Sequence, residues 1–128
     1  MVVLKQTPEG ARKALEMADK MLAMKDEKAV RDQLNNVLNN AFWIANWGPD
    51  TSWRPRASYF LEQQVALSKS PDWRHKLQLQ LGENYFRRDH DLEKARKVFA
   101  EVAAASDTNQ KDRELAELWC EMLSDTGQ

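Results

Sequence analysis

The sequence LGENYF at positions 81–86, followed by DLEKARKVF at positions 91–99, decides the fold. We interpret the two stretches as the end of one helix and most of the next. Gly82 inside a helix costs about 1 kcal/mol relative to alanine, and the chain has only four glycines. The absent side chain lets the next helix approach closely, and Tyr85 and Phe99 fill the space beside that contact. The stretch therefore predicts two helices packed against each other at Gly82.

Proline, glycine and capping residues divide the whole chain into six predicted helical segments. A capping side chain or a proline before an apolar-periodic run is typical of a helix start. Residues 48–55 are expected to form a loop, and the fourth helix to run from Pro71 to Arg88. No run of four to eight residues combines β-branched side chains with strict alternation, so we expect no sheet. The start signals, in chain order, are Thr7-Pro8, Asp26, Pro55, Ser70-Pro71, Asp91 and Asp107-Thr108-Asn109.

The stretch from Trp73 to Ala105 resembles the tetratricopeptide repeat, a pair of antiparallel helices that stacks on its neighbours. The residues that carry the resemblance are Leu81, Gly82, Tyr85, Ala95, Phe99 and Ala103. The resemblance is weak over residues 30–71, where Ile44 stands in place of an aromatic residue. It implies an all-α fold of about six antiparallel helices in a short right-handed stack. The helix pattern alone leaves a compact six-helix bundle as the alternative, and in both cases we expect a single α-helical domain over residues 1–128.

Composition limits the kinds of partner. The 128 residues carry 19 Lys and Arg against 20 Asp and Glu, a net charge of −1, which disfavours a nucleic-acid partner or an acidic membrane. Cys120 is the only cysteine, so neither an intrachain disulfide nor a cysteine metal site is expected. No window approaches the ~18 apolar residues of a membrane span. The apolar start at positions 1–4 is too short for a signal peptide. We therefore expect a soluble, cytoplasmic protein.

Sequence motifs of enzymes are absent. The chain has no glycine-rich phosphate loop, no HExxH, no nucleophile elbow and no CxxC. We interpret His75 and His90 as surface residues rather than metal ligands. These observations predict a non-catalytic protein without a cofactor or a bound metal.

Tryptophan is abundant, with five residues in the chain. The segment containing Trp53, Arg54 and Arg56 combines the residue types that are enriched at interaction hot spots. It lies at the end of the loop at 48–55, which is longer than a helix–helix link needs. We therefore expect these residues to bind a partner. The alternative is that they and the aromatic residues at 42–47 fix the loop to the core.

Asparagine is concentrated in the second predicted helix, at Asn35, Asn36 and Asn39, with Asn40 beside them. Asparagine is a poor helix former, and its amide both donates and accepts hydrogen bonds. These residues therefore predict a surface that binds an extended peptide backbone, with an ordinary solvated face as the alternative. The resemblance to tetratricopeptide repeats implies another binding face on the fourth helix, which ordinary amphipathic packing also explains. That face carries Lys76, Leu79, Glu83, Phe86 and Arg87.

Together these features predict a non-catalytic protein–protein interaction module. Such a module is an adaptor, chaperone or inhibitor-like subunit that binds a peptide or helix of a partner. The alternative is a structural helical subunit that self-associates as a homo-oligomer or belongs to a larger assembly. An enzyme of unrecognised type is a second alternative, which carboxylates with perturbed pKa values in a cleft would favour.

Overall fold

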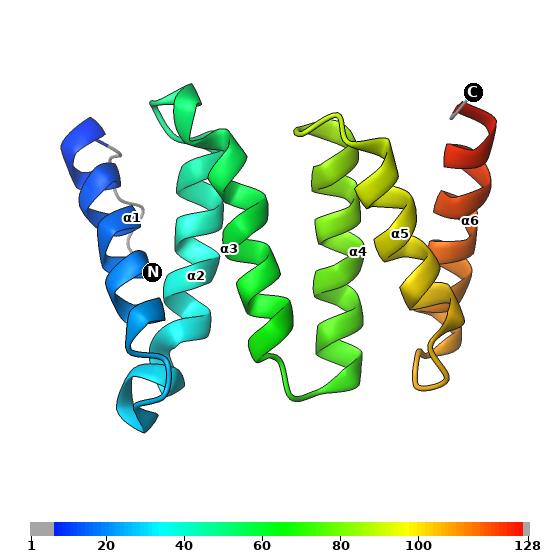
Figure 1. The fold of residues 1–128 in the computed structure, drawn as a ribbon, viewed down its shortest axis with the longest axis horizontal. Helices are drawn as coiled ribbons and strands as arrows, with labels where there is room; N and C mark the ends of the chain where they lie inside the picture. Colours follow the sequence, from blue (N-terminus) through cyan, green and yellow to red (C-terminus); the bar gives the residue numbers. More distant parts are fainter. Residues whose placement is uncertain (1–6, 127–128) are drawn as a thin grey trace. The chain divides into compact units, whose positions relative to one another are not determined.

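The computed structural model describes residues 7–126, and their regular secondary structure is entirely helical. Helices hold 83% of these residues and no strand is present among them, which confirms the prediction of an all-α fold. None of the helices in this range has both the length and the apolar character needed to cross a membrane. The elements in Figure 1 are α1 (Pro8–Ala23), α2 (Lys28–Trp47), the short 3₁₀ helix η1 (Thr51–Trp53), α3 (Arg54–Leu67), α4 (Pro71–Arg87), α5 (Leu92–Ala104) and α6 (Gln110–Thr126).

Contacts within the chain divide it into two compact units, residues 1–63 and residues 64–128. The first contains α1, α2, η1 and most of α3, and the second contains the end of α3 with α4, α5 and α6. In the first unit α1 packs against α2, and in the second α5 packs against both α4 and α6 (Figure 1). These packed neighbouring helices are compatible with a helical-repeat fold. The expectation of one domain over residues 1–128 stays a prediction.

Most helix starts form where capping residues predict them. The Thr7 side chain accepts a hydrogen bond from the Gly10 backbone N–H at 3.0 Å, and Ser70 caps α4 through the N–H of Trp73. The Asp91 carboxylate caps α5 by accepting from the backbone N–H of Lys94 at 3.1 Å. Each cap satisfies a backbone donor that has no partner inside its helix.

The predicted cap of the second helix is wrong. Helix α2 follows Glu27, which makes no side-chain cap hydrogen bond, and Asp26 lies in the turn before it. Arg31 closes this turn instead, because its guanidinium donates to the backbone oxygens of Lys25 and Asp26 at 3.1 and 3.0 Å. The Arg31 side chain, in the first turn of α2, therefore holds the turn between α1 and α2. The sequence had predicted that the Asp26 carboxylate would cap the helix at this turn.

The segment expected to be a loop at 48–55 is partly helical. Its centre forms η1, and α3 begins at Arg54, one residue before the predicted start. The Asp50 carboxylate accepts hydrogen bonds from the Ser52 hydroxyl at 2.6 Å and the Ser52 backbone N–H at 2.9 Å. These bonds lower the pKa of Asp50. The connection is thus a short helical turn capped by the Asp50 side chain.

The core of the first unit is built from apolar residues spaced three and four apart on each helix. One charged contact adds to it: Arg56 of α3 donates from Nη2 to both carboxylate oxygens of Asp19 on α1, at 2.7 and 2.6 Å. The buried core residues of α1 and α2 are Ala11, Leu15, Ala18, Leu22, Leu34, Leu38, Ala41, Phe42 and Ala45.

The core of the second unit is organised around Gly82. A Cβ atom at this position would lie 2.6 Å from Phe99 Cζ and 2.8 Å from Val98 Cγ1, both on α5. This close approach confirms the predicted contact of Gly82 with the next helix. The Phe99 ring in turn stacks on Trp119 of α6, with centroids 4.9 Å apart and planes 5° apart. The absence of a side chain at Gly82 therefore sets the distance between α4 and α5. The Phe99 ring, which lies at this crossing, also packs against Trp119 and so connects α5 to α6.

Apolar residues of α6 lie on two different sides of the helix. Leu123 is fully buried and Trp119 is partly buried, but Leu115, Leu118 and Met122 are 45%, 62% and 46% exposed. By helical spacing alone, all five would share one broad face. The structure differs because Ala116 and Leu123 contribute to the core, on the side of the helix opposite to Leu118.

Substitution of Gly82 tests this packing. Alanine is the better helix former by about 1 kcal/mol, yet its methyl group would enter the space of the buried Phe99 ring. We expect Gly82→Ala to lower the free energy of unfolding by about 1 to 3 kcal/mol in urea denaturation, because overpacking outweighs helix propensity. Ala100→Gly, on the exposed side of α5, is the control for propensity alone. A Gly82→Ala variant as stable as the parent protein or more stable would contradict the close crossing.

Candidate functional site

One side of α2 presents asparagine and tryptophan side chains to solvent. Asn36, Asn40, Trp43 and Trp47 follow one another at intervals of four, three and four residues, so they form one stripe along the helix. Asn39 lies beside this stripe, and all five residues are exposed. We call these five residues the α2 outer face.

The opposite side of α2 holds this face in place. Leu34, Leu38 and Ala41 are each 0 to 1% exposed. Because these positions pack into the core of the first unit, the helix cannot rotate without exposing them, and the outer face stays directed to solvent.

The two indoles of the α2 outer face form a stacked pair. The ring centroids of Trp43 and Trp47 lie 6.4 Å apart with planes inclined by 23°. Trp43 is 48% exposed and Trp47 59% exposed. The buried Phe42 ring contacts Trp43 edge-on at 5.3 Å and supports it from the core side. The two indoles thus form a broad apolar surface, and the buried Phe42 ring packs against one of them, Trp43.

The α2 outer face is also uncharged. From Gln33 to Trp47 there is no Asp, Glu, Lys or Arg, in a chain in which 30% of residues are charged. An exposed helix face in a soluble protein usually carries charged side chains. This stretch replaces them with amides and indoles, which can be desolvated on binding at much lower cost than ionised groups.

The sequence predicted only part of this face as a binding surface. Asn36 and Asn39 were expected in an amide surface, and the structure joins them to Trp43 and Trp47 on one face of α2. Asn35 is exposed as well and lies one turn before Asn39 on the same side of the helix. The sequence signal that could have joined the asparagines and the tryptophans into one face is the spacing of residues 36, 40, 43 and 47.

The Trp–Arg candidate is divided by the structure. Trp53 is half-buried at the end of η1, and Arg54 is exposed at the start of α3. Arg56 forms the ion pair with Asp19, and its guanidinium carbon lies 5.0 Å from the centroid of the Phe60 ring. The Arg56 side chain is therefore already engaged in contacts within the first unit.

The residues of the predicted binding face on α4 make contacts with α6 and with one another. Lys76 donates to Asp112 of α6 at 3.0 Å, and Phe86 contacts the Trp119 ring at 5.8 Å between centroids.

The other members of that face have local surroundings. Glu83 pairs with Arg87, four residues along α4, at 2.9 Å. Leu79 is buried. Because Leu79 is buried and Phe86 is half-buried, the apolar part of this face is less open than the indole pair of the α2 outer face.

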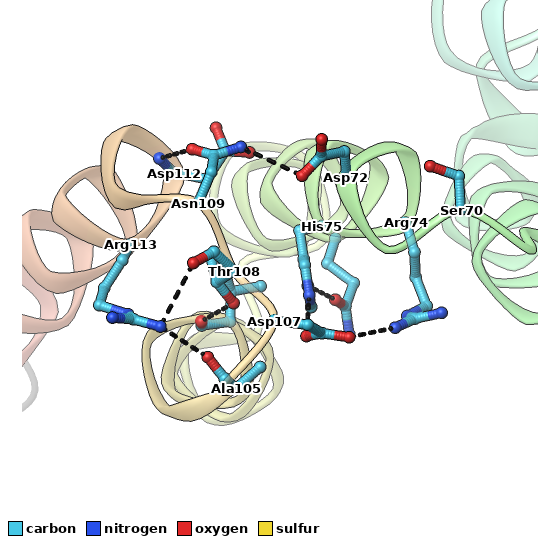
Figure 2. Close-up of polar contacts among 12 residues, drawn as sticks. Ser70, Asp72, Arg74, His75, Ala105, Asp107, Thr108, Asn109, Asp112 and Arg113 are labelled. Carbon is cyan, nitrogen blue, oxygen red and sulfur yellow. Dashed lines mark hydrogen bonds and ion pairs between the residues drawn. The ribbon is translucent and has the colours of Figure 1, made fainter.

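His75 is buried, and the prediction of a surface position is wrong. Its side chain is 4% exposed. Nε2 lies 2.8 Å from Asp107 Oδ1, and Nδ1 lies 2.9 Å from Gln78 Oε1 (Figure 2). Arg74 also reaches Asp107, at 3.3 Å. No local pattern in the sequence indicates this pairing, because Asp107 is 32 residues away from His75 along the chain.

These contacts fasten the turn between α5 and α6 onto α4. Figure 2 shows Thr108, Asn109 and Arg113 holding the same turn from its other side. Thr108 donates to the Val102 oxygen at 2.7 Å, and Arg113 donates to the Ala105 oxygen at 2.9 Å. The cluster is a structural fastening, since every polar side chain in it is used to fix the backbone or a neighbouring helix.

Chemistry-bearing groups are sparse elsewhere. Partial burial, together with the nearby charge of Glu117, raises the pKa of the Cys120 thiol, which keeps it in the less reactive protonated form. Within residues 7–126, no group of three or more His, Cys, Asp or Glu side chains is placed to hold a metal ion. The α2 outer face is therefore the feature of the described chain that is best suited to a binding function.

No protein-family model, curated protein or solved structure matches this chain. The function is accordingly inferred from its own side chains.

Acid should weaken the His75–Asp107 fastening. The hydrogen bond from His75, aided by the charges of His75 and Arg74, holds the pKa of Asp107 below its ordinary value of 3.8. The carboxylate therefore stabilises the folded state above about pH 4, and this contribution is lost as the pH falls through the lowered pKa. We expect Asp107→Asn to reduce the free energy of unfolding near pH 6 and to have a smaller effect near pH 2.5. Urea denaturation at both pH values measures this, and an equal effect at both would contradict the role of the carboxylate.

Proposed function

We propose that this protein is a non-catalytic protein–protein interaction module that binds a segment of a partner protein on the α2 outer face. The observation that carries the proposal is the stacked, half-exposed pair Trp43–Trp47 in line with asparagine amides. Tryptophan is among the residues most enriched at interaction hot spots. A soluble protein gains nothing in stability from placing two large indoles side by side in water.

The chemistry of the face favours an uncharged, extended segment as the ligand. The amides of Asn36, Asn39 and Asn40 can each donate to a backbone carbonyl and accept from a backbone N–H. The indoles next to them offer a flat apolar surface for aliphatic or proline side chains, as in aromatic-lined peptide sites. Since the face has no charged group to pair with, a strongly charged segment would lose solvation without compensation.

A tetratricopeptide-like architecture fits this use. We propose that α4 and α5 form one such helical pair, because Gly82 and Phe99 provide the close crossing on which the resemblance rests. In the same scheme α2 is the first helix of the preceding pair. First helices line the binding groove of such repeats, so the resemblance implies that Asn36, Asn39 and Trp43 face a ligand.

Paired substitutions of exposed tryptophans test the proposal. Trp43→Ala/Trp47→Ala removes the indole pair, and Trp73→Ala removes another tryptophan, 46% exposed on α4, as the matched control. Both variants should keep the helical circular dichroism of the parent protein and melt within a few degrees of it, because the side chains are half in solvent. We expect the double variant to bind its partner at least about 30-fold more weakly, since a hot-spot residue contributes about 2 kcal/mol or more.

Affinity enrichment from the native cell with quantitative mass spectrometry identifies the partner. Titration of the purified pair then measures the dissociation constant. If the double variant retains its partners at the parent's affinity, or if only Trp73→Ala loses them, the α2 outer face is not the binding surface.

A further inference from the structure

The exposed apolar residues of α6 are accompanied by a row of carboxylates. Leu115 and Leu118 are 45% and 62% exposed. Glu114, Glu117 and Glu121, all exposed, follow intervals of three and four, so they run along the helix next to the apolar residues. We call the exposed surface formed by Glu114, Leu115, Glu117, Leu118, Glu121 and Met122 the α6 outer face.

Helix α1 carries two exposed lysines in line with an exposed methionine, with Glu9 and Glu16 beside them. Lys13, Met17 and Lys20 are spaced four and three residues apart on α1 and therefore form one line, and Met24 is the C-cap residue that follows the helix. Met17 is 55% exposed and Met24 43% exposed. We call these four residues the α1 outer face.

The two outer faces have the same spacing and complementary chemistry. On α6 the line Glu114–Leu118–Glu121 repeats the intervals of Lys13–Met17–Lys20 on α1 with carboxylates in place of ammonium groups. The existing ion pair of Lys13 with Glu9, at 3.3 Å, joins side chains that are 66% and 69% exposed. Such a pair contributes little and can exchange partners.

We propose that the α6 outer face of one copy of this protein packs against the α1 outer face of a second copy. The apolar rows of the two helices meet along their length, and the glutamates of α6 lie opposite the lysines of α1. Packing α6 against another α6 would place carboxylates opposite carboxylates, which is unfavourable. Complementary charge therefore selects the head-to-tail contact over the symmetric one.

A head-to-tail contact has a distinctive consequence. It joins different surfaces of the two copies, so each added copy leaves one α1 face and one α6 face open, and association continues as the concentration rises. A contact between single helices is small, which places it among weak, reversible interfaces. This proposal involves neither Trp43 nor Trp47, and its outcome is independent of the proposed function.

Sedimentation velocity of the full chain tests the proposal. Between about 10 and 500 µM, the weight-average mass of the parent protein should rise above the 14.9 kDa of one chain. Leu118→Glu on α6 and Met17→Glu on α1 should each remain at the mass of one chain. Ala100→Glu, which adds the same charge at an exposed site on α5, and Trp43→Ala/Trp47→Ala should associate like the parent. Circular dichroism checks that each variant is folded.

An equimolar mixture of the Leu118→Glu and Met17→Glu variants tests whether the contact is head-to-tail. The Leu118→Glu chain retains its α1 outer face and the Met17→Glu chain retains its α6 outer face, so the mixture should form pairs and stop at two chains. A parent protein that keeps the mass of one chain at every concentration would overturn the proposal. So would association that survives Met17→Glu, since that result indicates a symmetric contact, or a mixture in which no pairs form.

Discussion

The contact between Gly82 and the Phe99 ring is the constraint on which the second unit depends. The ring occupies the space where any other residue at position 82 would carry its side chain, so the distance between α4 and α5 is set by what residue 82 lacks. With Phe99 fixed in this way, its other face is free to stack on Trp119, and that stack places α6. The turn that leads into α6 is then fastened by His75 and Asp107. A helix-destabilising residue thereby becomes the organising point of three helices.

The sequence predicts the elements of this fold well because their signals are local. Caps such as Thr7, Ser70 and Asp91 act on backbone groups three residues away, and the helices begin where those caps stand. The misplaced cap at Asp26 shows the limit of this reasoning. Several polar side chains compete for one turn, and the long reach of Arg31 prevails. A motif of capping residues does not reveal such a competition.

The candidate site could be predicted only in parts, for a different physical reason. Asn36, Asn39 and the tryptophans are visible as unusual composition, and the helical period explains why they share a face. Whether a lysine or arginine side chain is available to bind a partner depends on its ion pairs with residues that are distant in the sequence. Arg56 is held by Asp19, 37 residues away, and Lys76 by Asp112, 36 residues away. His75 is buried by the same kind of long-range pairing. The exposure of Leu118 likewise follows from which side of α6 meets α5, which its own apolar pattern does not specify.

Site-specific photocrosslinking tests the central claim, that the α2 outer face binds a partner protein, most directly. A photoreactive phenylalanine derivative replaces Asn40, in the middle of the face, and in a separate variant replaces Ala100, which is exposed on α5. After irradiation in the native cell, the account predicts a discrete crosslinked partner for position 40, none for position 100, and loss of the crosslink when Trp43 and Trp47 are also changed to alanine. Crosslinks of equal yield at both positions, or a crosslink at position 40 that persists without the two indoles, would contradict it.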